Sequence, residues 1–174
     1  MKLFELLNEY ARLTPDTVAL IDDARSISYS HLWKLIKANR CYLLEKGFQN
    51  QTVAYKIGSQ IKFAIDFLCL VASGCWVIPV SSDVSDAPFD QDENHCGIYH
   101  LTSGTTGEPK LCVRSLSALT KEGISFKYLL SLQGSKIASL SPIYHSYALG
   151  AAYMAALASG SKVYLMDKFI PRKA

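Results

Sequence analysis

Apolar residues along the chain fall into two kinds of pattern, one with helical spacing and one of short continuous runs. The helical pattern predicts helices at residues 2–13, 30–46, 60–73, 115–130 and 147–158. The short runs, which are bounded by turn-forming residues, predict strands at residues 18–21, 27–29, 52–56, 76–80, 97–101, 136–140 and 162–166. We expect Ser30 to cap the second helix and Gly47 to end it. Residues 81–94 are polar and acidic and predict a loop.

The order of these elements indicates an α/β fold. Strands and helices alternate from residue 50 onward, which favours a layered, mostly parallel sheet with flanking helices. The run at residues 76–80 is apolar throughout, as expected for a strand that is covered on both faces. The chain ends just after a strand, where such a sheet normally has a covering helix. We therefore expect an exposed apolar patch near residues 157–169, open to self-association or to a complementing polypeptide.

Composition narrows the class of protein. A length of 174 residues predicts one domain, and 49% hydrophobic with 19% charged residues excludes a disordered or low-complexity chain. The net charge is only +3 and the basic residues are scattered, which argues against a nucleic-acid partner. Five cysteines without a CxxC pair indicate neither a disulfide framework nor a zinc ribbon, and free thiols fit a cytoplasmic protein. The apolar stretches are too short for a membrane span of about 20 residues, and the N-terminus lacks the features of a signal peptide.

The segment with the clearest chemistry follows the strand at residues 97–101. It consists of small and hydroxyl-bearing residues followed by one lysine: Thr102, Ser103, Gly104, Thr105, Thr106, Gly107, Glu108, Pro109 and Lys110. The glycines let the backbone approach a ligand, hydroxyl and backbone N–H groups can donate to phosphate oxygens, and the lysine supplies a positive charge. The pattern is neither a Walker A loop nor a GxGxxG turn. It predicts a phosphate-binding loop, with an ordinary polar loop as the alternative.

This loop resembles the phosphate-loop signature of the adenylate-forming superfamily, which contains acyl- and aryl-CoA synthetases, peptide-synthetase adenylation domains and luciferases. Other segments resemble that family's motifs in the same order along the chain. They are residues 28–32, 74–80, 141–150 and 157–165, and the third is similar to the family's Pro-x-x-His-x-x-Gly motif. Leu111 stands where the family usually has glycine, but Leu111 together with Arg114 resembles some aryl-acid members.

The resemblance implies a two-step reaction. A carboxylic acid attacks the α-phosphorus of ATP to form an acyl-adenylate and pyrophosphate, and the thiol of CoA or of a carrier protein then takes the acyl group. The residues implied to bind the ATP phosphates, with Mg²⁺ nearby, are Thr102, Ser103, Gly104, Thr105, Thr106, Gly107 and Lys110. His145 is implied to line the carboxylate-side pocket and is the candidate catalytic residue.

The resemblance covers only the N-terminal part of the family. The family's adenine- and ribose-binding motifs, its magnesium-binding glutamate and its small C-terminal domain with the adenylation lysine have no counterpart in this sequence. We therefore expect residues 1–174 to form a truncated N-terminal AMP-binding domain that is inactive alone. The alternative is a naturally short, non-catalytic nucleotide-binding module or one half of a split ligase.

The remaining histidines favour structural or surface roles. We expect His100, on the strand that leads into the loop, to be structural, and His31 to lie at the surface. His95 and Cys96 lack a second pair of ligands, so they predict no metal site. Arg114 can reach a phosphate or a carboxylate, with a solvated surface arginine as the alternative.

Overall fold

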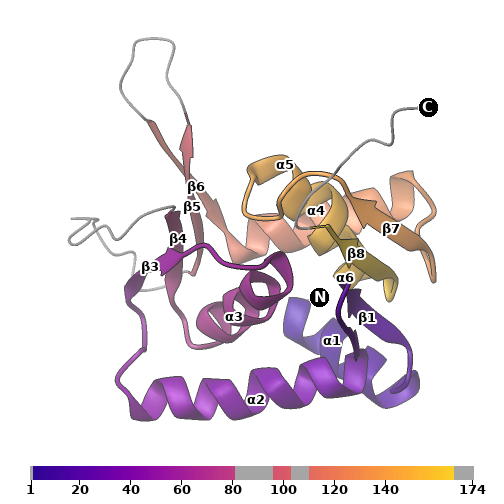
Figure 1. Cartoon of the computed structure of the whole chain (residues 1–174), viewed down its shortest axis with the longest axis horizontal. Coiled ribbons are helices and arrows are strands. Elements are labelled where there is room, and N and C mark those ends of the chain that lie inside the picture. The colour runs from indigo at the N-terminus through magenta and orange to yellow at the C-terminus, as the bar shows by residue number, and fades with distance from the viewer. Residues whose placement is uncertain (1, 81–95, 103–109, 167–174) are drawn as a thin grey trace.

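The computed structural model describes residues 2–80, 96–102 and 110–166, which form two four-stranded sheets with helices packed around them (Figure 1). The strands are β1 (Val18–Ile21), β2 (Ser26–Ser28), β3 (Thr52–Lys56), β4 (Trp76–Val80), β5 (Gly97–Thr102), β6 (Lys110–Ser115), β7 (Lys136–Ser139) and β8 (Lys162–Leu165). The helices are α1 (Leu3–Leu13), α2 (Tyr29–Glu45), α3 (Gln60–Ala72), α4 (Leu116–Leu129), α5 (Ser146–Ala148), the π-helix η1 (Leu149–Met154) and α6 (Ala155–Ser159). The expected α/β fold is confirmed, but the strands divide between two mixed sheets.

The first sheet joins the beginning of the chain to its end. Its strand order is β2–β1–β8–β7, in which β1 and β2 form an antiparallel hairpin. Strand β8 runs parallel to both β1 and β7 and lies between them. This pairing brings together residues that are more than 140 positions apart, such as Leu20 and Val163. Short-range sequence patterns cannot reveal such a contact, which explains why a single sheet was expected.

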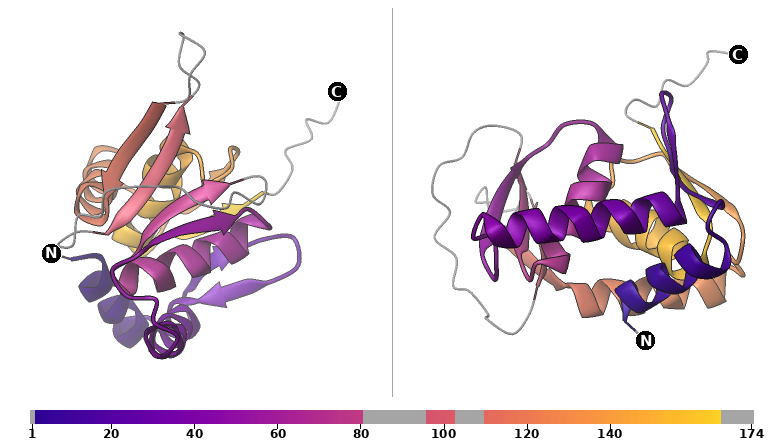
Figure 2. Two further views of the ribbon diagram at one scale, coloured as in Figure 1. Left: turned by 90° about the vertical axis from the view of Figure 1, so that its left-hand side faces the viewer. Right: turned by 90° about the horizontal axis from the view of Figure 1, so that it is seen from below.

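The second sheet carries the predicted phosphate loop. Its order is β3–β4–β5–β6, with β3, β4 and β5 parallel and β6 antiparallel to β5. Strand β6 was not predicted, because its residues 110–115 mix charged and apolar side chains without a strict alternation. Strands β5 and β6 run out from the body of the molecule as a hairpin, as Figure 1 and the left view of Figure 2 show.

Helix ends follow the local side-chain chemistry, with one correction. Ser28, and not Ser30, caps α2: the hydroxyl of Ser28 accepts a hydrogen bond from the backbone N of His31 at 3.3 Å. Ser28 has the extended backbone of strand β2, so the helix begins at the next residue and Ser30 already lies inside it. Gly47 follows α2 with a φ of +80°, which a residue with a side chain rarely adopts, so its predicted role as the helix end is confirmed.

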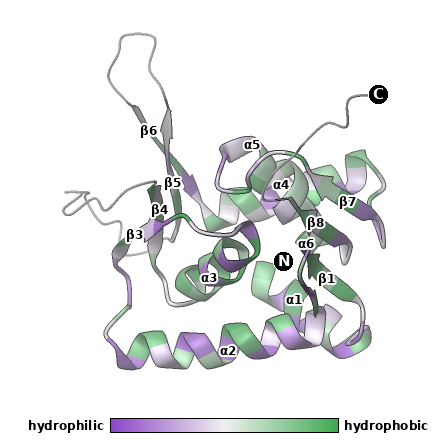
Figure 3. Cartoon of the chain, viewed as in Figure 1, coloured by the Kyte–Doolittle hydropathy of each residue, from purple (hydrophilic) through white to green (hydrophobic). Residues whose placement is uncertain are grey.

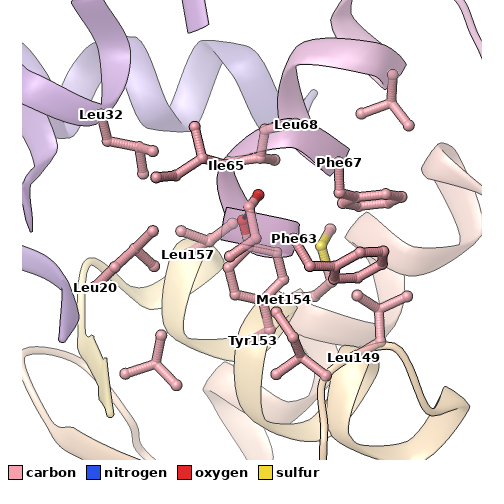
Figure 4. Packing of buried hydrophobic residues seen from close by; sticks show 14 of the residues in the cluster. Leu20, Leu32, Phe63, Ile65, Phe67, Leu68, Leu149, Tyr153, Met154 and Leu157 are labelled. Atoms are coloured by element: carbon pink, nitrogen blue, oxygen red, sulfur yellow. Dashed lines mark hydrogen bonds between the residues drawn. The ribbon is translucent and has the colours of Figure 1, made fainter. Parts of the chain in front are cut away.

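The core is centred on α3, which is buried along most of its length (Figure 4). Phe63 and Phe67 stack with their ring centroids 6.0 Å apart and lie with Leu68 among the apolar residues of η1 and α6. Tyr153 of η1 is fully buried, and its hydroxyl donates to the backbone O of Ala64 at 2.7 Å. Colouring by hydropathy shows that green, apolar segments of these helices face one another, whereas α2 alternates along its length (Figure 3).

The segment at residues 147–158, predicted to be one helix, is divided into α5, η1 and α6. The π-helical turn adds one residue to the usual repeat, so the apolar positions on either side of it face the same core. Apolar periodicity alone cannot detect such an insertion.

The expected apolar patch near residues 157–169 is absent over the part that the structure describes. Leu157, Val163 and Leu165 are buried, because β8 is an inner strand and α6 packs against α1 and α4. Residues 167–169 lie outside the described ranges. The exposed large apolar residues are found elsewhere, and three of them, Tyr128, Leu129 and Leu130, follow one another at the end of α4. No helix among the described residues is long and apolar enough to span a bilayer.

Candidate functional site

The β5–β6 hairpin sets the two ends of the predicted phosphate loop. The strands pair in continuous register from Gly97 with Ser115 to Thr102 with Lys110. Thr102 and Lys110 are therefore opposite one another at the last rung of the ladder, and residues 103–109 join them. The predicted phosphate ligands within that loop, namely Ser103, Gly104, Thr105, Thr106 and Gly107, lie outside the described residues.

His145 lies in a turn next to this hairpin. Its backbone is extended (φ −83°, ψ 142°), and it is the N-cap residue of α5, although its side chain makes no capping hydrogen bond. Its backbone N donates to the carbonyl of Pro142 at 3.0 Å, and its carbonyl accepts from the N of Leu149 at 3.0 Å. The imidazole is exposed, with its centroid 5.0 Å from that of the Tyr144 ring. The turn thus presents the ring outward and leaves its nitrogens available to a ligand.

Arg114 connects the hairpin to this turn. Its Nη1 donates to the backbone O of Ser146 at 2.6 Å and approaches the Ser146 hydroxyl at 3.1 Å. Its Nη2 forms an ion pair with Glu122 of α4. The Arg114 side chain is only 19% exposed, and burial lowers its pKa, but an arginine remains charged. The sequence left open whether Arg114 binds a ligand or faces solvent, and the structure instead gives it two partners within the chain.

His100 lies on the neighbouring strand and is 5% exposed. Burial, reinforced by the positive charge of Arg114 and by His145, lowers the pKa of His100 to about 4. A hydrogen bond between the ring and the backbone of Tyr144 opposes this shift. Its Nε2 has no hydrogen-bond partner among the described residues. His100 is therefore a neutral, buried histidine at neutral pH, in agreement with the expected structural role.

Glu122 and Gly150 belong to the same cluster, and no sequence pattern indicates a role for either. A Cβ at position 150 would overlap the carboxylate of Glu122, so glycine is the residue that leaves room for the ion pair with Arg114. Gly150 lies in η1, and π-helical turns occur frequently at functional sites. Because Glu122 and Arg114 belong to different elements, only the fold brings them together.

The start of the turn is held from a third direction. The side-chain Oε1 of Gln60, a buried residue of α3, accepts a hydrogen bond from the backbone N of Ile143 at 2.8 Å. The hydroxyl of Ser139 donates to the backbone O of Ser141 at 2.7 Å. The segment that carries His145 is therefore fixed by side chains from several elements, unlike a freely solvated loop.

The other candidates lie apart from this cluster. His31 is at the surface, as expected. Cys96 donates to the carbonyl of Val71 at 3.3 Å, and burial raises its pKa to about 11, which makes it a poor metal ligand. His95 lies outside the described residues, within which no group of three or more His, Cys, Asp or Glu side chains could hold a metal ion. A cavity of about 280 Å³ between α2, α3 and β3 is lined by none of the predicted site residues.

Comparisons with known proteins identify the fold and the family. The family model described as AMP-binding enzyme matches residues 83–174, just over half of the chain, including the predicted loop and the His145 turn. The N-terminal subdomain of NpsA from Klebsiella oxytoca, in complex with 3-hydroxybenzoyl-AMSN, superposes with a TM-score of 0.78 at 19% identity, over 99% of this chain and 55% of that one. O-succinylbenzoate coenzyme A synthetase (MenE) from Bacillus subtilis, in complex with AMP, gives a TM-score of 0.77 at 17% identity, over 95% of this chain and 56% of that one.

A third solved structure, VinN, gives a TM-score of 0.79 at 13% identity, over 95% of this chain and 59% of that one. No curated protein sequence matches the chain. The chain spans between half and three fifths of the length of these three solved structures. At these identities the structural likeness establishes the fold, and the family model establishes the relationship. The chain belongs to the family of AMP-binding, adenylate-forming enzymes.

Proposed function

We propose that this chain is the N-terminal part of an ATP-dependent ligase that activates a carboxylic acid and transfers it to a thiol. The observation that carries the proposal is the β5–β6 register, which places Thr102 and Lys110 at the two ends of the phosphate-loop sequence. The same hairpin contacts the turn with His145 through Arg114, four residues after Lys110. Both segments lie within the residues that match the AMP-binding family.

The proposed reaction balances as two substitutions. A carboxylate oxygen of the acid bonds to the α-phosphorus of ATP, and pyrophosphate leaves with the electrons of the broken P–O bond. A thiol sulfur of CoA or of a carrier protein then bonds to the acyl carbon, its proton is lost, and AMP leaves. Lys110 and the hydroxyl and backbone N–H donors of residues 102–107 balance the negative charge on the β- and γ-phosphates. His145 lines the side on which the carboxylate approaches.

Mg²⁺ enters this proposal together with ATP, as part of the substrate. The loop carries several hydroxyl groups, and Mg²⁺ prefers oxygen ligands. In nucleotide sites Mg²⁺ is coordinated mainly by water and phosphate oxygens, with few ligands from the protein. The loop's donor set therefore fits a magnesium–phosphate complex better than a site built wholly from protein side chains.

The acid is proposed to be an acyl or aryl carboxylic acid. MenE is named for a CoA ligase of O-succinylbenzoate, and the NpsA complex contains a benzoyl ligand. Because this chain spans only part of such proteins, we propose that it binds the nucleotide but does not complete adenylation without the remaining segments.

Calorimetric titration of the 174-residue chain with MgATP tests the proposal. We expect saturable binding by the wild type, and Lys110→Ala should weaken it about tenfold or more, since it removes a charge-assisted contact to phosphate. Lys121→Ala is the matched control, because Lys121 is an exposed lysine on α4. Equal binding by Lys110→Ala and Lys121→Ala would contradict the assignment of the loop, and exchange of pyrophosphate into ATP by the chain alone would contradict its expected inactivity.

A further inference from the structure

We propose that Arg114 is a positioning residue that fixes the His145 turn to the hairpin that carries the phosphate loop. Arg114 lies on strand β6 of that hairpin and holds Ser146, the residue that follows His145. The catalytic meaning of this arrangement rests on the proposed function, but the arrangement itself can be tested without it.

Arg114 holds the residue that follows His145. Its Nη1 donates to the backbone O of Ser146 at 2.6 Å and to the Ser146 hydroxyl oxygen at 3.1 Å. One side chain thus holds both the backbone and the side chain of that residue. A planar guanidinium loses less freedom than a lysine in making several hydrogen bonds at once. The Arg114 side chain is only 19% exposed, which reduces competition from water for these hydrogen bonds.

His100 is a buried neighbour of Arg114 on the hairpin. His100 pairs with Cys112 across the ladder, and Ile98 pairs with Arg114, so His100 and Arg114 are diagonal neighbours. Burial and the charge of Arg114 lower the pKa of His100 to about 4, so His100 adds no second positive charge beside Arg114 at neutral pH. His145 is thus held through Ser146 while its own ring stays exposed.

Glu122 and Gly150 support the arginine. A buried guanidinium without a counter-charge would be unfavourable, and Glu122 provides that charge from α4. The carboxylate reaches Arg114 because Gly150 has no Cβ at the point where the two segments cross. The π-helix places Gly150 in this position directly after α5.

The consequence is that the Lys110 end of the hairpin and His145 are held in a fixed relation. Arg114 lies four residues after Lys110 on the same strand, about 13 Å away at the usual rise of an extended chain. A paired antiparallel hairpin resists bending over this distance, so a nucleotide phosphate bound at one end is held at a fixed separation from His145 at the other. A carboxylate placed by His145 is then positioned against the phosphorus that it attacks.

Amide hydrogen exchange of the folded chain tests the proposal, with the amides of His145 and Leu149 as reporters, because both make hydrogen bonds within the turn. We expect Arg114→Met to speed their exchange about tenfold or more and leave the amides of α1 unchanged. Arg114→Lys should restore part of the protection, since it keeps the charge. Lys121→Met, on the exposed face of α4, is the control for an apolar replacement of a cation.

A second readout separates positioning from general support of the fold. The ¹⁵N signals of the His145 ring should shift in Arg114→Met and return toward the wild type in Arg114→Lys. If Arg114→Met does not fold, Glu122→Gln serves instead, because it keeps the side-chain size and weakens only the ion pair.

Unchanged exchange in the turn, or an equal increase throughout the chain, would overturn the inference. Failure of the wild type to bind MgATP would overturn the proposed function and leave the exchange result standing. The two ideas can therefore fail separately.

Discussion

The core around α3 is fully buried, whereas the polar cluster around Arg114 is half-buried, and the two regions are built from opposite chemistry. Around α3, apolar side chains such as Phe67 and Leu68 fill the space, and the buried Tyr153 hydroxyl donates a hydrogen bond to the carbonyl of Ala64 (Figure 4). In the cluster, Arg114 and Glu122 are partly removed from water and His100 is buried, which costs stability. The apolar core therefore stabilises the fold, whereas the polar cluster holds the His145 turn in place.

This contrast predicts that mutations in the two regions act on different quantities. The largest effect on stability is expected in the core. Phe67→Ala should lower the free energy of unfolding by about 3–5 kcal/mol, because it removes a fully buried ring and leaves a cavity. Phe67→Leu should cost much less. Denaturant unfolding measures both, and a cost for Phe67→Ala below about 1 kcal/mol would contradict the placement of α3 at the centre of the core.

Gly150→Ala is expected to disturb the cluster next most strongly. The new methyl group would displace the Glu122 carboxylate from Arg114, so we expect a loss of about 1–3 kcal/mol in unfolding free energy. Gly58→Ala is the control, because a Cβ at Gly58 meets no atom within 4 Å. In a double-mutant cycle, Gly150→Ala combined with Glu122→Ala should cost less than the sum of the single changes. Additive costs would show that Glu122 does not occupy that space in solution.

The pH dependence of the unfolding free energy should reflect the protonation of His100. Its pKa is about 4 in the folded protein and about 6.5 when unfolded, so only the unfolded state takes up a proton between these values. Stability from this group is complete above pH 6.5 and is lost progressively as the pH falls toward 4. We expect a loss of about 1–2 kcal/mol between pH 7 and pH 5, measured by denaturant unfolding. His100→Asn should flatten that change, and an unaltered pH profile would argue that His100 is accessible to water.

The smallest expected effect on stability concerns the two serines at the start of α2. Ser28→Ala should cost about 1 kcal/mol, since it removes the hydroxyl that accepts from the backbone N of His31. Ser30→Ala should cost less, because Ser30 lies inside the helix and its hydroxyl is hydrogen-bonded to the Ser28 hydroxyl, at 3.1 Å, and not to a backbone group at the helix end. Thermal unfolding compares the two directly, and a larger loss for Ser30→Ala would restore Ser30 as the cap.

Most elements could be predicted because each helix or strand buries a face that its own spacing reveals. The apolar run of α3 and the strands at residues 52–56 and 76–80 are of this kind. The division into two sheets could not be predicted, because it depends on β8 inserting beside β1 across most of the chain length. Strand β6 was missed for a related reason: its pairing with β5, and not its own pattern, makes it a strand.

The same distinction applies to the site. Residues of the phosphate loop and His145 could be named from contiguous motifs, and their roles remain predictions. Glu122 and Gly150 could not be named, since the ion pair and the close approach exist only after α4 and η1 pack together. Arg114 was noted but its partners were not, because the groups that it contacts are 8 and 32 positions further along the chain.

If Arg114 couples the hairpin to the His145 turn, both segments should respond together when a nucleotide binds. Titration of the ¹⁵N-labelled chain with MgATP, followed by amide NMR, tests it most directly. We predict that signals from residues 110–115 and from residues 143–149 shift together and saturate with one dissociation constant. Shifts confined to one of these segments, or none in either, would contradict the account.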